Sequence, residues 1–84
     1  MIIKPKKISV TTADTIQSMA TMASETVIKN IGTTDCYIDF NRAIDTNDSY
    51  VLEAGEQLTI EGRFENLHHK TASGTTTIHT ISIQ

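Results

Sequence analysis

The sequence has little of the material from which disulfide frameworks and large cores are built. It holds one cysteine, one proline and no tryptophan, and only 5% of its residues are aromatic. A single cysteine excludes an intrachain disulfide, and the scarcity of rings excludes a core built on large aromatic side chains. Because only 38% of the 84 residues are hydrophobic, we expect contacts with other chains to supplement a thin core, and homo-oligomers are predicted.

The chain also lacks a surplus of positive charge and a long hydrophobic run. Its formal net charge is −3, whereas a dedicated nucleic-acid binder normally carries a basic surplus. The opening segment from Met1 to Lys7 has no apolar stretch of the kind found in secretion signals, and no later segment has the length of a membrane span. We therefore expect synthesis in a cytosol and no nucleic-acid or membrane partner.

Alternation of apolar and polar residues predicts β-strands over most of the chain. Cys36, Ile38 and Phe40 alternate with Tyr37 and Asp39, which places the two sets on opposite faces of a strand. Similar patterns predict strands at residues 7–11, 57–61 and 75–83. Glycines that can take a positive φ mark three turns, at Gly32, Gly55 and Gly74. The sequence predicts an all-β fold, a small antiparallel β-sandwich or jelly-roll-like barrel, formed by one domain over residues 7–84.

Two segments depart from simple alternation. Residues 13–23 show helical spacing of apolar side chains, so a short helix competes there with a loop or an irregular strand, which we favour. In residues 75–83, Ile81 and Ile83 share a face with His79, whereas Ile78 points the other way. Either a bulge intervenes, or this strand is apolar on both faces and packs against a neighbour.

The only basic cluster lies at the start of the chain. Lys4, Lys6 and Lys7 flank Pro5, which keeps this stretch extended. We expect residues 1–6 to form an N-terminal arm, which is either a solvated tail or an anchor that docks on an acidic neighbour.

The histidines are the first candidates for metal ligands. His68 and His69 are adjacent, and neighbours on an extended strand point to opposite faces, so they cannot easily share one ion. His79 would have to arrive from another strand. An exposed pair beside a turn is the favoured interpretation, and no metal is predicted.

A second candidate resembles the spacing of an EF-hand loop. Asp45, Asn47, Ser49 and Glu56 occupy positions one, three, five and twelve, but Tyr50 stands where the loop requires glycine. Strands instead of helices flank the segment. An Asx-rich surface turn explains these residues better than a calcium site.

No catalytic residue is predicted. The available carboxylates are Asp39, Glu53, Glu56 and Glu61, and a glycosidase pair among them would need a cleft that a domain of this size rarely forms. Cys36 lies on a face that we expect to be buried, where a thiol is usually inert. No nucleophile elbow or glycine-rich phosphate loop is present. We therefore expect a protein that is not an enzyme and has no cofactor.

The order of strands and turns resembles a family of small virion proteins of tailed bacteriophages. The segments that carry the resemblance are residues 7–12, 25–32, 36–40, 52–60 and 72–78. The polar stretch at residues 63–69 departs from the pattern. The resemblance implies a β-sandwich that binds other virion proteins, such as major capsid, neck or tail subunits. It also implies location in the virion after synthesis in the bacterial host cytoplasm. Capsid decoration or cement is the favoured role, with a neck, connector or fibre-associated component as the alternative.

Two other functions compete with the virion role. A glycan-binding module would use Tyr37 and Tyr50 as a stacking platform. A small hydrolase comes last, since no nucleophile, base and oxyanion donors converge in the sequence.

Overall fold

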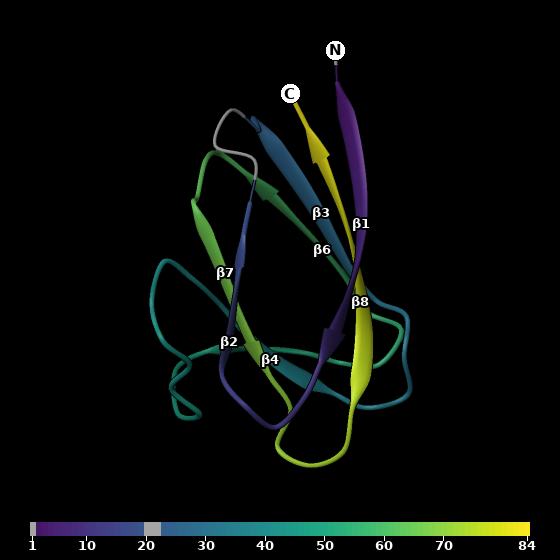
Figure 1. The fold of residues 1–84 in the computed structure, drawn as a ribbon, viewed down its shortest axis with the longest axis vertical. Helices are drawn as coiled ribbons and strands as arrows, with labels where there is room; N and C mark the ends of the chain where they lie inside the picture. Colours follow the sequence, from purple (N-terminus) through teal and green to yellow (C-terminus); the bar gives the residue numbers. More distant parts are fainter. Residues whose placement is uncertain (1, 20–22) are drawn as a thin grey trace.

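The computed structural model describes residues 2–19 and 23–84, which form eight β-strands and no helix. Accordingly, no helix in these two ranges is long and apolar enough to cross a membrane. The strands form two four-stranded sheets that face each other (Figure 1). The strand bounds are β1 Ile3–Val10, β2 Thr15–Ser18, β3 Glu25–Asn30, β4 Cys36–Phe40, β5 Tyr50–Leu52, β6 Gln57–Glu61, β7 Asn66–Lys70 and β8 Thr76–Ile83.

The strand order is that of a jelly roll. One sheet, called sheet A below, has the order β1-β8-β3-β6, and the other, sheet B, has the order β2-β7-β4-β5. Every pairing is antiparallel. Apart from the β4–β5 hairpin, successive strands alternate between the sheets, as in a double Greek key. The predicted fold class, a small antiparallel β-sandwich or jelly-roll-like barrel, is confirmed.

The core lies between the two sheets. Inward positions alternate as predicted in β1, where Ile8 and Val10 are buried, and in β4, where Cys36 and Ile38 are buried. The complete buried apolar cluster is Ile8, Val10, Ile28, Cys36, Ile38, Leu52, Phe64, Leu67 and Ile78. Rings contribute one edge-to-face contact, between Phe40 and Phe64 at 4.8 Å. The sheets therefore pack mainly through aliphatic side chains.

A buried asparagine ties this core together. The Asn30 side-chain NH₂ donates to the backbone oxygens of Thr34 at 2.8 Å and Leu52 at 3.0 Å. Its Oδ1 accepts from the Thr76 hydroxyl at 2.8 Å and from the Gly32 N–H at 3.1 Å. Because an unpaired buried amide is costly, four partners explain how Asn30 can be fully buried.

The three turn glycines have different reasons to be glycine. Gly55 and Gly74 have φ values of 83° and 71°, in the left-handed region that disfavours other residues. Gly32 is instead required by close approach, because a Cβ there would clash with the Thr76 Oγ1. All three lie between strands, as the sequence predicts.

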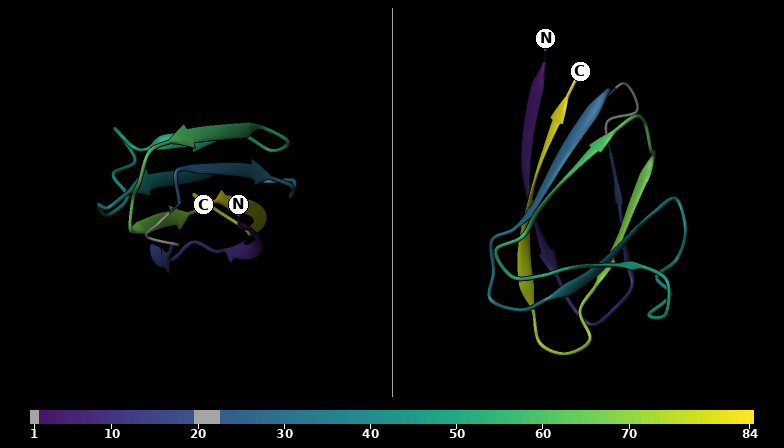
Figure 2. Two further views of the ribbon diagram at one scale, coloured as in Figure 1. Left: turned by 90° about the horizontal axis from the view of Figure 1, so that it is seen from above. Right: turned by 180° about the vertical axis from the view of Figure 1, so that it is seen from behind.

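The start of the chain differs from the expected arm. Ile3 to Lys6 belong to β1 and pair continuously with β8, from Ile3 opposite Ile83 to Lys6 opposite Thr80. β1 is an edge strand, and an edge tolerates Pro5 because its missing N–H removes no required ladder bond. The two ends of the chain meet beyond this pairing, where Ile2 and Gln84 exchange backbone hydrogen bonds of 3.2 and 2.8 Å (Figure 2).

The segment with helical spacing contains a strand. Residues 15–18 form β2, which pairs with β7, so the helix is not formed there. The rest of the predicted segment includes residues 20–22, which lie outside the described residues. The polar stretch that departed from the virion pattern contains most of β7, a central strand between β2 and β4.

Candidate functional site

A pocket of about 590 Å³ opens between β1, β2 and β8. The parts of β1 and β8 that line it lie toward the end of the molecule that carries the termini (Figure 1). This volume is within the range of roughly 300–1,000 Å³ that small-molecule sites occupy. β1 and β2 are the edge strands of their sheets, and the pocket lies where these two edges face each other. Its lining residues are Ile3, Lys4, Pro5, Lys6, Ser18, Met19, Thr80 and Ser82.

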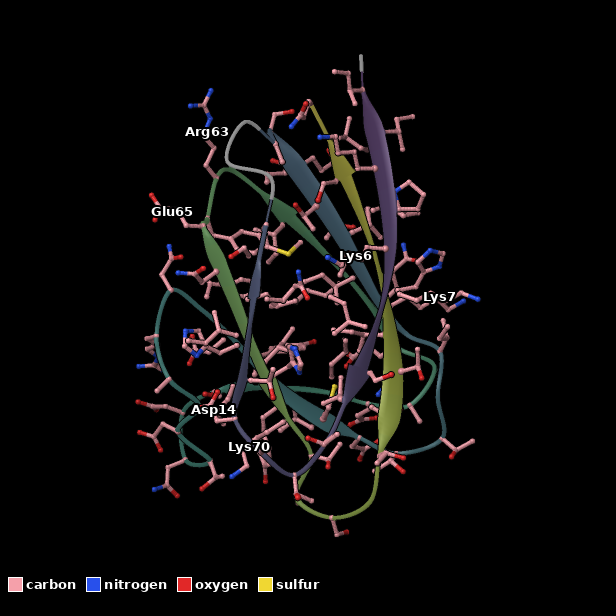
Figure 3. All side chains as sticks on the ribbon, viewed as in Figure 1. Lys6, Lys7, Asp14, Arg63, Glu65 and Lys70 are labelled. Carbon is pink, nitrogen blue, oxygen red and sulfur yellow. The ribbon has the colours of Figure 1, made fainter. Side chains whose placement is uncertain are left out.

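The lysines of β1 divide between the pocket and the outer surface. Lys6 points into the space between the two sheets, whereas Lys7 points away from them (Figure 3). Since side chains alternate along a strand, Lys4 shares the face of Lys6, which is also the face of the buried Ile8 and Val10. The predicted basic cluster is therefore split, with two members lining the pocket.

Hydroxyl groups complete the polar part of the pocket. Thr80 and Ser82 are 1% and 4% exposed and follow Ile78 along the inward face of β8. The Thr80 hydroxyl donates to the Lys6 backbone oxygen at 3.4 Å, and Ser18 faces the same space from β2. The described lining residues include no carboxylate, imidazole or thiol, and no ion pair of the described chain involves Lys4 or Lys6.

His68 and His69 point to opposite faces of β7, as predicted. Both side chains are buried, so the prediction of an exposed pair is wrong. The His68 Nδ1 lies 3.4 Å from the Asp14 Oδ1. His69 is 1% exposed, and neither ring nitrogen has a hydrogen-bond partner among the described residues. Burial lowers the pKa of His69, a shift that Asp14 partly opposes. His69 is therefore held as a neutral imidazole in the core.

A hydrogen-bonded network fixes the connection between β4 and β5 to sheet B. Asp39 accepts from the Arg42 Nε at 2.6 Å and from the Ser49 hydroxyl at 2.8 Å. Asp14 accepts from the Ile44 N–H at 2.9 Å. Burial would raise the pKa of Asp39, but the bonds from Arg42, Ser49 and the Phe40 N–H together lower it. Both carboxylates therefore bind groups of the β4–β5 connection and hold it against sheet B.

The residues with EF-hand spacing do not converge on one point. The Asp45 Oδ1 accepts the Asn47 N–H at 3.0 Å, which is an Asx turn, and the Asp45 N–H donates to the Ser49 hydroxyl. Glu56 lies in another turn, where it accepts from the Glu53 N–H at 2.9 Å and the Tyr50 hydroxyl at 3.0 Å. Its oxygens are directed to that turn and not to Asp45.

The remaining candidates do not form a site either. Tyr37 pairs with Val51 and Tyr50 pairs with Ile38, which places the two rings on opposite faces of sheet B, so no stacking platform forms. Neither Glu53 nor Glu61 lines the pocket. Cys36 is buried, as predicted, and burial with the nearby Asp35 raises the pKa of its thiol to about 11.

Comparison with known proteins assigns the fold. No family model and no curated protein matches the sequence. Among solved structures, the chain is similar to the enzyme HppE with Co(II) and substrate, at a TM-score of 0.67 and 13% identity over 96% of this chain. A cupin-2 domain protein from Shewanella frigidimarina has a TM-score of 0.61 and 18% identity over 98% of this chain. The cupin-2 domain of an XRE family transcriptional regulator from Enterobacter cloacae has a TM-score of 0.63 and 9% identity over 99%.

These neighbours differ in length and in role. The chain spans 44% of the HppE chain and 71% of the Shewanella protein, but 95% of the regulator domain. The molecule therefore has the fold of cupin-2 domains, a fold that occurs in an enzyme and in a part of a transcriptional regulator. The fold alone leaves enzymatic activity undecided.

The resemblance to virion proteins is wrong. The structural neighbours are cupin-2 domains, regulators and HppE, not phage particle proteins. The expectations that followed from this resemblance are therefore wrong as well. They are capsid decoration, its neck or fibre alternative, the binding to virion subunits and the location in a virion. The physical reason is that short strands joined by Gly and Asn turns specify a sandwich, and unrelated sandwiches share that pattern.

The neighbour with cobalt raises the question of a metal centre. The described residues include no group of three or more His, Cys, Asp or Glu side chains that could hold a metal ion. His68 and His69 face opposite sides of one strand. His79 lies on the outer face of sheet A, between its register partners Lys7 and Lys29 on the neighbouring strands. The histidines therefore do not fit a metal centre of that kind.

Four pocket residues are not among those that the sequence pattern singles out: Ser18, Met19, Thr80 and Ser82. A signal for two of them was present, because Thr80 and Ser82 follow the buried Ile78 at spacings of two. Polar residues at inward positions of a strand indicate either a buried network or a cavity. No local signal places Ser18 and Met19 opposite them, since that contact joins two sheets.

Proposed function

We propose that this chain is a non-enzymatic binding module that holds a small anionic molecule in the pocket between β1, β2 and β8. The observation that carries the proposal is the placement of Lys6 and Lys4 on the pocket wall, with no carboxylate among the lining residues that the structure describes. Ammonium groups that lack a protein counter-ion favour a ligand that supplies one.

The rest of the pocket wall fits a ligand with a charged head and a short apolar body. Hydroxyls of Ser18 and Ser82 can donate to carboxylate, phosphate or phosphonate oxygens. Ile3, Pro5 and Met19 supply apolar surface in the same pocket. A few convergent polar groups in a partly apolar concavity are typical of small-molecule sites.

Binding without catalysis is favoured by the composition of the wall. General acid–base chemistry usually relies on His, Asp or Glu, and nucleophilic catalysis on an activated Ser, Cys or Lys. The lining residues that the structure describes include no imidazole, carboxylate or thiol. A solved domain of nearly equal length and the same fold belongs to a transcriptional regulator, which supports a role other than catalysis.

The test compares two probes that differ only in charge. Butyrate and butyramide have similar size, so titration of each into the protein, followed by NMR chemical shifts, isolates the contribution of the anionic head. We expect butyrate to bind at least about tenfold more tightly, since a hydrogen bond to a charged group contributes roughly 1.5–3 kcal/mol.

Adjacent lysines provide a matched control. Lys6→Met removes the ammonium that points into the pocket, and Lys7→Met removes one that points away, with the same change in net charge. Butyrate affinity should fall about tenfold or more in the first variant and remain within a factor of two in the second. Equal losses in both variants, or equal binding of the amide, would contradict an anion site in this pocket.

A further inference from the structure

The outer face of sheet A carries three rows of side chains that run across the strands. The register of β1, β8, β3 and β6 defines them. The lysine row is Lys7, His79, Lys29 and Gln57; the central row is Pro5, Ile81, Val27 and Thr59; the glutamate row is Ile3, Ile83, Glu25 and Glu61. Neighbouring rows are separated by two residues, or about 7 Å.

These side chains point outward because their sequence neighbours point inward. Thr26, Ile28 and Asn30 in β3 are buried, which places Glu25, Val27 and Lys29 on the opposite face. The same alternation in β8 places His79, Ile81 and Ile83 outward, all half-buried. Ile3 on β1 is 58% exposed. The face thus has an apolar centre with positive charge along one side and negative charge along the other.

This arrangement is complementary to itself. Rotation by 180° about an axis along the central row, in the plane of contact, turns one face onto an identical face and exchanges the lysine and glutamate rows. Each strand then faces the same strand of the other copy in the opposite direction. Lys29 would face Glu25 of the second copy, Glu25 would face Lys29, and Val27 and Ile81 would each face their own counterparts. Such self-complementarity is what a two-fold interface requires.

We infer that the outer face of sheet A docks a second copy of this chain, face to face, about a two-fold axis along the Val27–Ile81 row. Aligned packing of two sheets about 10 Å apart is a common arrangement in β-sandwiches. It explains why β8 carries isoleucines on both faces. Ile78 packs in the core, while Ile81 and Ile83 face the second copy.

The apolar row provides affinity and the charged rows set orientation. Exposed ion pairs contribute little individually, but like charges placed opposite each other disfavour the alternative alignments. In a parallel alignment the lysine rows would meet. Three rows of four side chains make up the face, so we expect a dimer that dissociates on dilution.

Charge reversal on β3 tests the alignment of the rows. Lys29→Glu and Glu25→Lys each place like charges opposite each other twice in a dimer of that variant. Each variant alone should sediment as a monomer at concentrations where the unaltered chain dimerises. An equimolar mixture of the two should recover the dimer, because every charged pair between unlike copies is then of opposite sign.

Two further variants separate docking from folding and from charge alone. Ile81→Lys should abolish dimerisation, with circular dichroism and thermal unfolding showing that the variant is folded. Arg63→Glu changes the net charge as Lys29→Glu does, but Arg63 lies in the β6–β7 connection and points away from the sheets (Figure 3). Its dimerisation should match that of the unaltered chain.

The docking face is the outer face of sheet A, whereas Lys6 lines the pocket on the inward face. Lys6→Met should therefore leave dimerisation unchanged, whether or not butyrate binds. A monomer of the unaltered chain at millimolar concentration would overturn the inference. So would a mixture of Lys29→Glu and Glu25→Lys that remains monomeric while the unaltered chain dimerises.

Discussion

The two ends of β1 and β8 show how one pair of strands serves two purposes. Toward the end away from the termini, their inward residues Ile8, Val10 and Ile78 are packed into the core. Toward the termini, the inward positions are Lys4, Lys6, Thr80 and Ser82, which line a pocket. The strand pairing is continuous across both halves. The backbone ladder therefore keeps the half that lines the pocket, called the open half below, ordered. The other half, called the closed half, supplies the apolar side chains that β1 and β8 place in the core.

The largest expected effect of a single substitution is in the closed half. Ile78→Ala removes a fully buried side chain from between the sheets and should lower the free energy of unfolding by about 2–5 kcal/mol. Ser82→Ala, two positions beyond Thr80 on the same inward face, should change it by less than about 0.5 kcal/mol. Urea unfolding of both variants measures the difference, and similar losses would mean that the pocket end contributes equally to stability.

A substitution at Gly32 tests the tightness of the closed half. Gly32→Ala places a Cβ against the Thr76 hydroxyl and 2.9 Å from the Thr77 backbone nitrogen. The clash should cost roughly 1–3 kcal/mol of stability. Thr76→Ala in the same chain should restore only part of the loss, because the clash with the backbone persists and Asn30 loses a donor. Gly55→Ala provides a contrast. It would lower stability because of the positive φ at this position, and not because the new Cβ meets a neighbouring atom.

The buried imidazole makes the closed half sensitive to acid. The pKa of His69 is lowered in the folded chain, so the unfolded chain binds a proton more readily as the pH falls below about 6.5. His69→Leu should remove this loss and raise stability at pH 5 by roughly 1 kcal/mol, with a smaller change at pH 8. Chemical unfolding at both pH values measures the slope. His79→Leu, on the outer face of sheet A, is the control, and an unchanged slope in His69→Leu would contradict this explanation.

The thiol of Cys36 reports on opening of the same half without any substitution. Because its pKa is raised to about 11 and the side chain is buried, alkylation by iodoacetamide at pH 9 should be far slower in the folded chain than in urea. Mass spectrometry of the labelled fraction follows the rate. Rapid labelling under native conditions would show that the closed half opens frequently.

Fold class could be predicted from the sequence because β1, β4 and β6 obey simple alternation, with Ile8, Val10, Cys36 and Ile38 buried as expected. β7 could not, since His68 and His69 are polar residues that the surrounding structure buries on both faces. The pocket could not be predicted from the sequence for a related reason. It is created where β1 and β2 approach each other, and contacts between two sheets leave no trace in the local order of residues.

The meeting of Ile2 and Gln84 has a consequence for how the chain can be rearranged. Backbone groups of these residues bond to each other, so a short flexible linker could join the present ends without straining the sheet. New ends could then be opened in the connection between β4 and β5. Such a circular permutant should retain the same strand order, although its folding would begin from a different set of neighbouring segments.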